Sequence, residues 1–293
     1  MKLRFRGVRG SIPTPGAHTV KYGGNTTCIE IRTDNGELLI LDAGTGIYTL
    51  AQQLVEAMPV DAHIFITHTH WDHIQGLPFF TPAFVPGNHI TVYGGLDPVT
   101  QQSIQRALAV QLQYSFFPIR EAELKADIRY VTLTPGNSVS VGDARITPFL
   151  LNHPVLNFGY RIDCDGRSLF FTGDYEPLFN IYQPEDPEFA SFQTMIDEKF
   201  AELCAFIADV DALIVDASYT EQEYERKKGW GHGTYLTGLN LARAANAKRL
   251  FFTHHEPGRT DNALDAIYQQ LIENHPPSEF ELLMAREGAD YTI

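Results

Sequence analysis

The chain has 293 residues, and its 22 Lys and Arg against 36 Asp and Glu give a formal net charge of −14. This length can bury a full core, and the 44% of hydrophobic residues excludes an intrinsically disordered chain. The acidic balance argues against a broad basic face for a nucleic-acid backbone and against an anionic membrane surface as a partner.

Cysteine use and hydropathy indicate the compartment. Only three cysteines occur, far apart and odd in number, which argues against a disulfide framework. The first residues contain no apolar core of signal-peptide length, and no segment approaches the ~20 apolar residues of a membrane span. We therefore expect a cytoplasmic protein without a membrane partner.

Apolar runs of strand length alternate with helical spacing and turn signals along the chain. In the first half they predict a hairpin of strands 28–33 and 37–42 around Asn35-Gly36, a helix over 47–58, strands over 62–67 and 90–95, and a helix over 97–113 with Asp97 as N-cap and Pro98 in its first turn. In the second half they predict two strands within 138–153, two within 160–174, a strand within 211–219, a helix over 236–247, a strand within 248–256, a helix over 263–275 and a strand within 280–285.

Strand-rich stretches that end in helices occur twice, and no linker separates the two halves. This order predicts two sheets packed face to face with helices outside, in one domain over 1–293. Residues 177–208 stand apart, because a loop with three prolines precedes an amphipathic helix. That segment is either an ordinary covering helix or an active-site lid.

The string His68-Thr-His70-Trp-Asp72-His73 directly follows the strand expected over 62–67. Alternate residues of an extended chain project to the same side, so His68 and His70 can reach one point. If a helix then begins, Asp72 and His73 project toward a second point nearby. Four such side chains in six residues make a poor core and a good metal site.

Further candidate ligands follow other strands. His153 and Asp174 each end an apolar run, and His254 and His255 together end another. A single histidine at a strand end is more often structural. Together, however, these residues occupy the carboxyl ends of strands, where α/β proteins collect ligands.

These motifs resemble one known family. HTHWDH resembles the HxHxDH signature of the metallo-β-lactamase-fold hydrolases, and NHPVLNFGY, FFTGDYEP and FFTHHEP are similar to its later motifs in the same order, over nearly the whole chain. The resemblance implies an α/β fold, specifically a four-layer αβ/βα sandwich, and two divalent metal ions. Zn²⁺ is the family default, while the N and O donors also suit Mn²⁺ or Fe²⁺.

The same resemblance implies a ligand set. One metal would take His68, His70 and His153; the other would take Asp72, His73 and His254; and Asp174 would bridge both. His254 directly follows the apolar-Thr end of its strand, as the family's last histidine does, and His255 remains its competitor.

A second motif, Gly231-His232-Gly233-Thr234, resembles the extra histidine motif of the family's phosphodiesterase branch, which includes tRNase Z and cyclic-nucleotide phosphodiesterases. It implies that His232 is a general acid or a phosphate contact, and Asp72 is counted with it as catalytic. The alternative is that His232 caps the helix that follows.

Three other polar residues are candidates for supporting roles. Asp42, at the end of its strand, resembles a family position that orients metal ligands. A dinucleotide-binding loop at Gly44-Thr-Gly46 is the competing interpretation, but its third glycine is missing. Asp216 is expected to act similarly or to accept backbone hydrogen bonds, and Asn25 is expected either near the metals or in a turn.

The expected function is a dinuclear metal-dependent hydrolase, a phosphodiesterase on a small or cyclic phosphodiester with a metal-bridging hydroxide as nucleophile. The alternatives are a thioester, lactone or other carbonyl-ester hydrolase, and a non-catalytic metal-binding or sensing module. Only one hairpin fits between His153 and Asp174, where tRNase Z has a long basic arm, and no basic block stands out elsewhere. We therefore expect no long nucleic acid as a partner, and a homodimer is left open.

Overall fold

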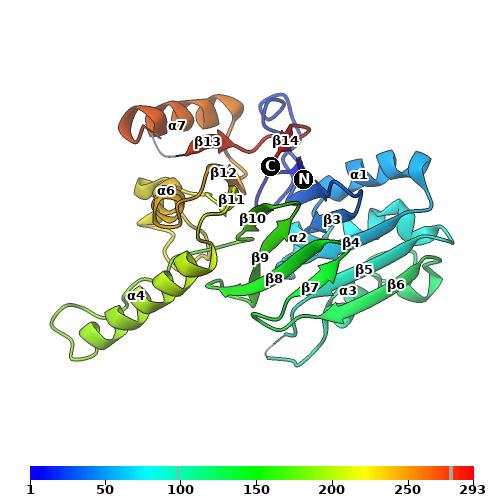
Figure 1. Ribbon diagram of the computed structural model, residues 1–293, viewed down its shortest axis with the longest axis horizontal. Helices are drawn as coiled ribbons and strands as arrows, with labels where there is room; N and C mark the ends of the chain where they lie inside the picture. The colour runs from blue at the N-terminus through cyan, green and yellow to red at the C-terminus, as the bar shows by residue number, and fades with distance from the viewer. Residues whose placement is uncertain (98, 277–279) are drawn as a thin grey trace.

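Two seven-stranded β-sheets form the centre of the protein in the computed structural model, which describes residues 1–97, 99–276 and 280–293 (Figure 1). The first sheet has the order β14-β1-β2-β3-β4-β5-β6, with β14 (Asp290–Thr292), β1 (Lys2–Gly7), β2 (Cys28–Arg32), β3 (Leu38–Leu41), β4 (Asp61–Phe65), β5 (His89–Gly94) and β6 (Asp127–Thr132). The second has the order β13-β12-β11-β10-β9-β8-β7, with β13 (Glu281–Met284), β12 (Arg249–Thr253), β11 (Ala212–Asp216), β10 (Arg167–Phe171), β9 (Asn157–Cys164), β8 (Ala144–Leu151) and β7 (Val139–Val141).

Helices accompany both sheets. Figure 1 shows α1 (Gly46–Leu54), α2 (Trp71–Ile74) and α3 (Ile104–Gln111) on the side of the first sheet, and α4 (Phe189–Phe206), α6 (Tyr235–Ala244) and α7 (Asp261–Asn274) on the side of the second. The remaining helices are short: α5 (Glu221–Tyr224) and the 3-10 turns η1 (Val55–Ala57), η2 (Leu77–Phe79), η3 (Thr81–Phe84) and η4 (Glu121–Glu123). None of the described helices is both long and apolar enough to span a bilayer.

The buried side chains fall into three layers of contact. Between the sheets, Phe65 of β4 stacks on Tyr93 and meets Tyr160 of β9, with ring centroids 4.3 and 5.5 Å apart. Outside the first sheet, apolar residues of α1 and α3 bury the strands, and outside the second sheet α6 and α7 do the same. Helix, sheet, sheet and helix thus form the predicted four-layer α/β sandwich, and this prediction is confirmed.

The helix predicted over 97–113 is shorter than expected. It begins at Ile104 with Ser103 as N-cap. Asp97 instead accepts hydrogen bonds from the backbone N–H groups of Val99 and Thr100, at 2.8 and 3.1 Å, so it caps a local turn. Pro98 lies outside the described residues.

The topology brings the chemically active segments to one edge. Strands β3 and β4 are parallel neighbours in the first sheet, as are β10, β11 and β12 in the second. The carboxyl ends of parallel strands meet at the same edge of a sheet. The loops that leave these five strands carry nearly all of the candidate site.

Candidate metal centre

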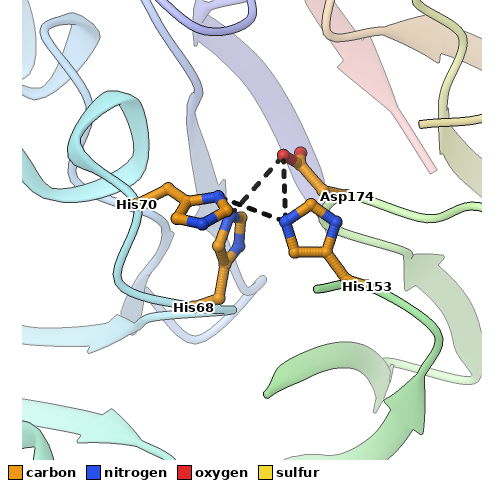
Figure 2. A group of neighbouring side chains, drawn as sticks. All are labelled: His68, His70, His153 and Asp174. Carbon is orange, nitrogen blue, oxygen red and sulfur yellow. Dashed lines mark hydrogen bonds and ion pairs between the residues drawn. The ribbon is translucent and has the colours of Figure 1, made fainter. Parts of the chain in front are cut away.

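Three histidines and one carboxylate converge from the three loops that follow β4, β8 and β10 (Figure 2). His70 Nδ1 lies 3.2 Å from His153 Nε2, and Asp174 Oδ2 lies 3.6 Å from His68 Nε2 and 3.9 Å from His153 Nε2. All four candidate ligand atoms lie within 4.8 Å of one another. The spacing of His68 and His70 therefore acts as the sequence predicts, because both rings reach one point after β4.

A second group shares Asp174 with the first. Asp174 Oδ1 lies 3.1 Å from Nε2 of both His73 and His254, and His254 Nε2 lies 3.2 Å from Asp72 Oδ2. Asp72 and His73 point to this second group because the chain turns into α2 at Trp71. The structure thus places every residue of the implied ligand set in two adjoining groups around one shared carboxylate.

Hydrogen bonds on the far side of the rings fix their orientation. His73 Nδ1–H donates to Asp42 Oδ2 at 2.7 Å, so its Nε2 faces Asp174. Thr67 Oγ1 donates to Asp42 and accepts from His68 Nδ1 at 3.0 Å. One buried carboxylate therefore orients a histidine of each group, which is the role that the family resemblance implies for Asp42.

Two more rings, those of His153 and His254, are held in the same way by residues that follow β11. His153 Nδ1–H donates to the carbonyl of Gly231 at 2.9 Å. His254 Nδ1 is 3.0 Å from Ser218 Oγ, which donates to Asp216 at 2.8 Å. In both histidines Nε2 is the atom that faces the cluster.

The donor set fits divalent cations. Among the described residues, His68 Nε2, His73 Nε2 and Asp174 Oδ1 are buried without a hydrogen-bond partner. Buried polar atoms without a partner are costly, and a cation shared by these lone pairs removes that cost. Burial also lowers the pKa of His68 well below its usual range, so the ring is neutral and able to bind a metal.

His232 lies against this cluster, with its Nδ1 2.8 Å from Asp216 Oδ2 and 3.7 Å from Asp174 Oδ2. Burial lowers its pKa, but the charges of Asp216 and Asp174 outweigh burial and raise the pKa to about 9. Bound cations would pull this pKa back down, because like charges disfavour the protonated ring. The helix-cap alternative is wrong, because the cap of α6 is Thr234, which forms a capping box with Thr237.

His255, the competitor of His254, is turned away from the cluster. Its Nε2 donates to the carbonyl of Ala285 at 2.9 Å, and burial lowers its pKa to about 3. The hydrogen bonds of Asn25 are also made away from the cluster, because its backbone N–H and side-chain amide both donate to Glu287. The alternative of a turn residue is the one that the structure supports for Asn25.

An open cleft of about 450 Å³ leads from solvent to the cluster; it is lined by Ser11, Thr69, His70, Trp71, Asp72, Asp174 and His232. The backbone N–H of Ser11 donates to Asp72 Oδ2 at 2.7 Å. Next to it, a Cβ atom on Gly10 would lie 2.2 Å from His254 Cε1, so only glycine fits there. No sequence pattern predicts this N-terminal contact, because it depends on which distant loop reaches the cleft.

Glu176 is another functional residue that the sequence pattern did not single out. Its Oε1 accepts hydrogen bonds from the Tyr224 hydroxyl and the Gly229 N–H at 2.8 and 2.7 Å, and its Oε2 accepts from the Gly231 N–H at 2.8 Å. This buried carboxylate fixes the segment that carries the carbonyl partner of His153. Its place two residues after Asp174 was the only available hint.

Comparisons with known proteins agree with this geometry. A family profile described as "Beta-lactamase superfamily domain" matches residues 38–255. The chain is 26% identical to ribonuclease Z from Staphylococcus carnosus over 97% of each chain. Its fold is similar to the metallo-beta-lactamase fold protein YhfI from Bacillus subtilis (TM-score 0.68, 19% identity, 99% of each chain). It is also similar to human tRNase Z, short form (TM-score 0.63, 21% identity, 100% of this chain and 99% of that one).

These relatives overturn one expectation. We expected no long nucleic acid as a partner, yet proteins named ribonuclease Z align with nearly the whole chain. Net charge is a sum over the whole surface and does not describe the potential at one cleft. The statement that no basic block stands out is also wrong, because Arg226, Lys227 and Lys228 are consecutive and lie just before His232.

Proposed function

The chain belongs to the beta-lactamase superfamily, and on that basis we propose that it is a dinuclear metal-dependent phosphodiesterase. The observation that carries the proposal is the pair of ligand groups that share Asp174, with His232 directed at the same cleft and held by Asp216. A carbonyl-ester hydrolase would need the metals, but its reaction does not require a histidine such as His232, which is paired with a carboxylate and lies outside the ligand set.

The metals have defined positions in this proposal. His68, His70 and His153 would hold one cation; Asp72, His73 and His254 would hold the other; and Asp174 would be shared. Two such cations supply an activated water as nucleophile and neutralise the negative charge that develops on phosphate. Asp42, Thr67 and Ser218 keep the ligating nitrogens directed inward, which favours metal binding in one geometry.

In this proposal the protein itself supplies the proton for the leaving group, through His232. His232 Nδ1–H donates to Asp216, so Nε2 is the nitrogen left to face the substrate. We assign it the proton that the leaving oxygen needs when the P–O bond breaks. Asp216 holds the ring in place and stabilises its protonated form.

Metal analysis and paired assays test the proposal. The metal-loaded protein should hydrolyse bis(p-nitrophenyl) phosphate and a short RNA, and should be much less active on a thioester and a lactone. His232→Ala should impair RNA cleavage more than release of p-nitrophenolate, because that ion is a good leaving group without a proton. Clear turnover of the carbonyl substrates without any phosphodiester turnover would reject the proposal.

Three finer assignments accompany it. We propose Zn²⁺ as the cation, supported by the mixed imidazole and carboxylate donors, and a cytoplasmic location, supported by three unpaired cysteines. We also propose that residues 1–293 act as one domain in which 177–208 covers the site. The placement of α4 supports this, since a groove of about 950 Å³ between α4 and the end of β8 extends to His153.

A further inference from the structure

The segment that precedes His232 combines positive charge with aromatic surface. Arg226, Lys227 and Lys228 form the only run of three consecutive basic residues in a chain with a net charge of −14, and Trp230 follows two residues later. The Trp230 side chain is 62% exposed. An exposed aromatic ring beside basic residues is the combination with which proteins bind the bases and phosphates of single-stranded nucleic acid.

This segment is held in one conformation. Glu176 accepts hydrogen bonds from Tyr224, Gly229 and Gly231, so both ends of the segment are bonded to the same buried carboxylate. Gly231 has a φ of 91°, and a Cβ atom there would lie 2.5 Å from His153 Nδ1. The basic and aromatic side chains therefore project from a rigid support that is part of the metal centre.

A cation–π contact of Lys227 and a contact between two aromatic rings connect Lys227 to the site. Its Nζ lies 4.2 Å from the centroid of the Tyr219 ring and 5.8 Å from that of the Trp230 ring. The Tyr219 ring in turn lies 5.9 Å from the ring of His232. Within the part of the chain that the structure describes, the ion pair of this run is Lys228 with Glu225, at 3.9 Å, and none is found for Lys227.

We propose that Lys227 and Trp230 form a binding subsite for the leaving group of a nucleotide phosphodiester. The proposal rests on the proposed function, because His232 marks the leaving-group side of the scissile phosphate. Trp230 offers a face on which a base can stack, and Lys227 offers a cation for the phosphate beyond it. An acidic protein can thereby attract an anionic substrate locally without a broad basic surface.

Substrates of graded length test the subsite through the ratio of their KM values. We would compare methyl thymidine 5′-phosphate, a dithymidine monophosphate and the same dinucleotide with a terminal phosphate. Trp230→Ala should raise KM for the dinucleotides about 5-fold or more relative to the methyl ester, since stacking contributes ~1–3 kcal/mol per base. Trp230→Phe should restore most of the loss. Lys227→Ala should mainly affect the substrate with the terminal phosphate.

Lys125→Ala is the matched control, because it removes the same charge from an exposed position on a loop before β6. If Lys227→Ala and Trp230→Ala change the KM ratios no more than this control, the subsite is rejected while the phosphodiesterase assignment stands.

A binding measurement separates the two hypotheses further. The chain has two tryptophans, so in a Trp71→Phe variant the fluorescence reports on Trp230 alone. Adenosine monophosphate should quench it in the metal-loaded protein, and Lys227→Ala should weaken this binding. Quenching in this variant, together with no hydrolysis of any phosphodiester by the unsubstituted metal-loaded protein, would reject the proposed function and keep the subsite. Absence of quenching would reject the subsite.

Discussion

Glu176→Gln tests how the segment before His232 supports the metal centre. The carboxylate accepts three hydrogen bonds with two oxygens, at 2.7 to 2.8 Å. Glutamine has nearly the same shape but only one accepting oxygen, so an N–H of Gly229 or Gly231 would face an amide NH₂ group. A buried hydrogen bond to a charged group contributes about 1.5–3 kcal/mol, and that is the expected destabilisation of the segment.

The substitution of Glu176 should affect both metal binding and catalysis. Gly231 provides the carbonyl that orients His153, and it precedes His232 directly. We therefore expect weaker binding of the cation held by His68, His70 and His153, by about 10-fold or more, and a lower kcat on RNA. Binding of the cation held through His73 and His254 should change much less, because Asp42 and Ser218 still hold those rings.

The assay is a competition titration of the metals with a chromophoric chelator, together with kcat on RNA and thermal unfolding. Glu273→Gln is the control, because Glu273 is an exposed residue of α7 and lies outside the segment proposed to cover the site. Equal metal affinities and equal kcat in the two variants would refute the supporting role of Glu176.

Three further predictions concern the ligands themselves. Asp42→Asn should weaken the cation bound through His73 by about 10–100-fold, as measured by the same titration, because the ring loses its buried carboxylate partner. Gly10→Ala should lower the metal content and Tm together, since the added Cβ atom would overlap His254; a variant with full metal content would contradict the packing. His254→Ala should lower metal stoichiometry by elemental analysis, whereas His255→Ala should lower Tm and keep the metals, and the reverse pattern would exchange their roles.

The convergence of four of the seven candidate ligands could be predicted from the sequence, because their spacing is local. Four candidate ligands lie within the six residues that lead from β4 into α2: His68, His70, Asp72 and His73. The repeat of extended chain directs the first two to one point, and the turn of the helix directs the last two to another. The choice between His254 and His255 could not be derived from the pattern alone. In the structure His254 has a φ of 58°, and the chain turns there, so His254 faces Asp174 while His255 points back to Ala285.

One prediction was wrong because a local signal has a second use. Asp97 looks like a helix cap, but its carboxylate caps a turn, because Asp serves both kinds of N–H group equally well. For His232 the structure decides between two interpretations, because Thr234 and Thr237 cap α6 and leave the imidazole to Asp216.

By itself, the sequence determined the chemistry of the ligands and the sandwich of two sheets, since both follow from residue type and short-range spacing. Only the tertiary structure decided what surrounds those ligands. Ser11 is far along the chain from Asp72, and Glu176 is far from Gly229 and Gly231, so no periodicity relates these partners. The parallel strands bring their loops to one edge, and there a small basic and aromatic surface lies beside the candidate metal centre of an acidic protein.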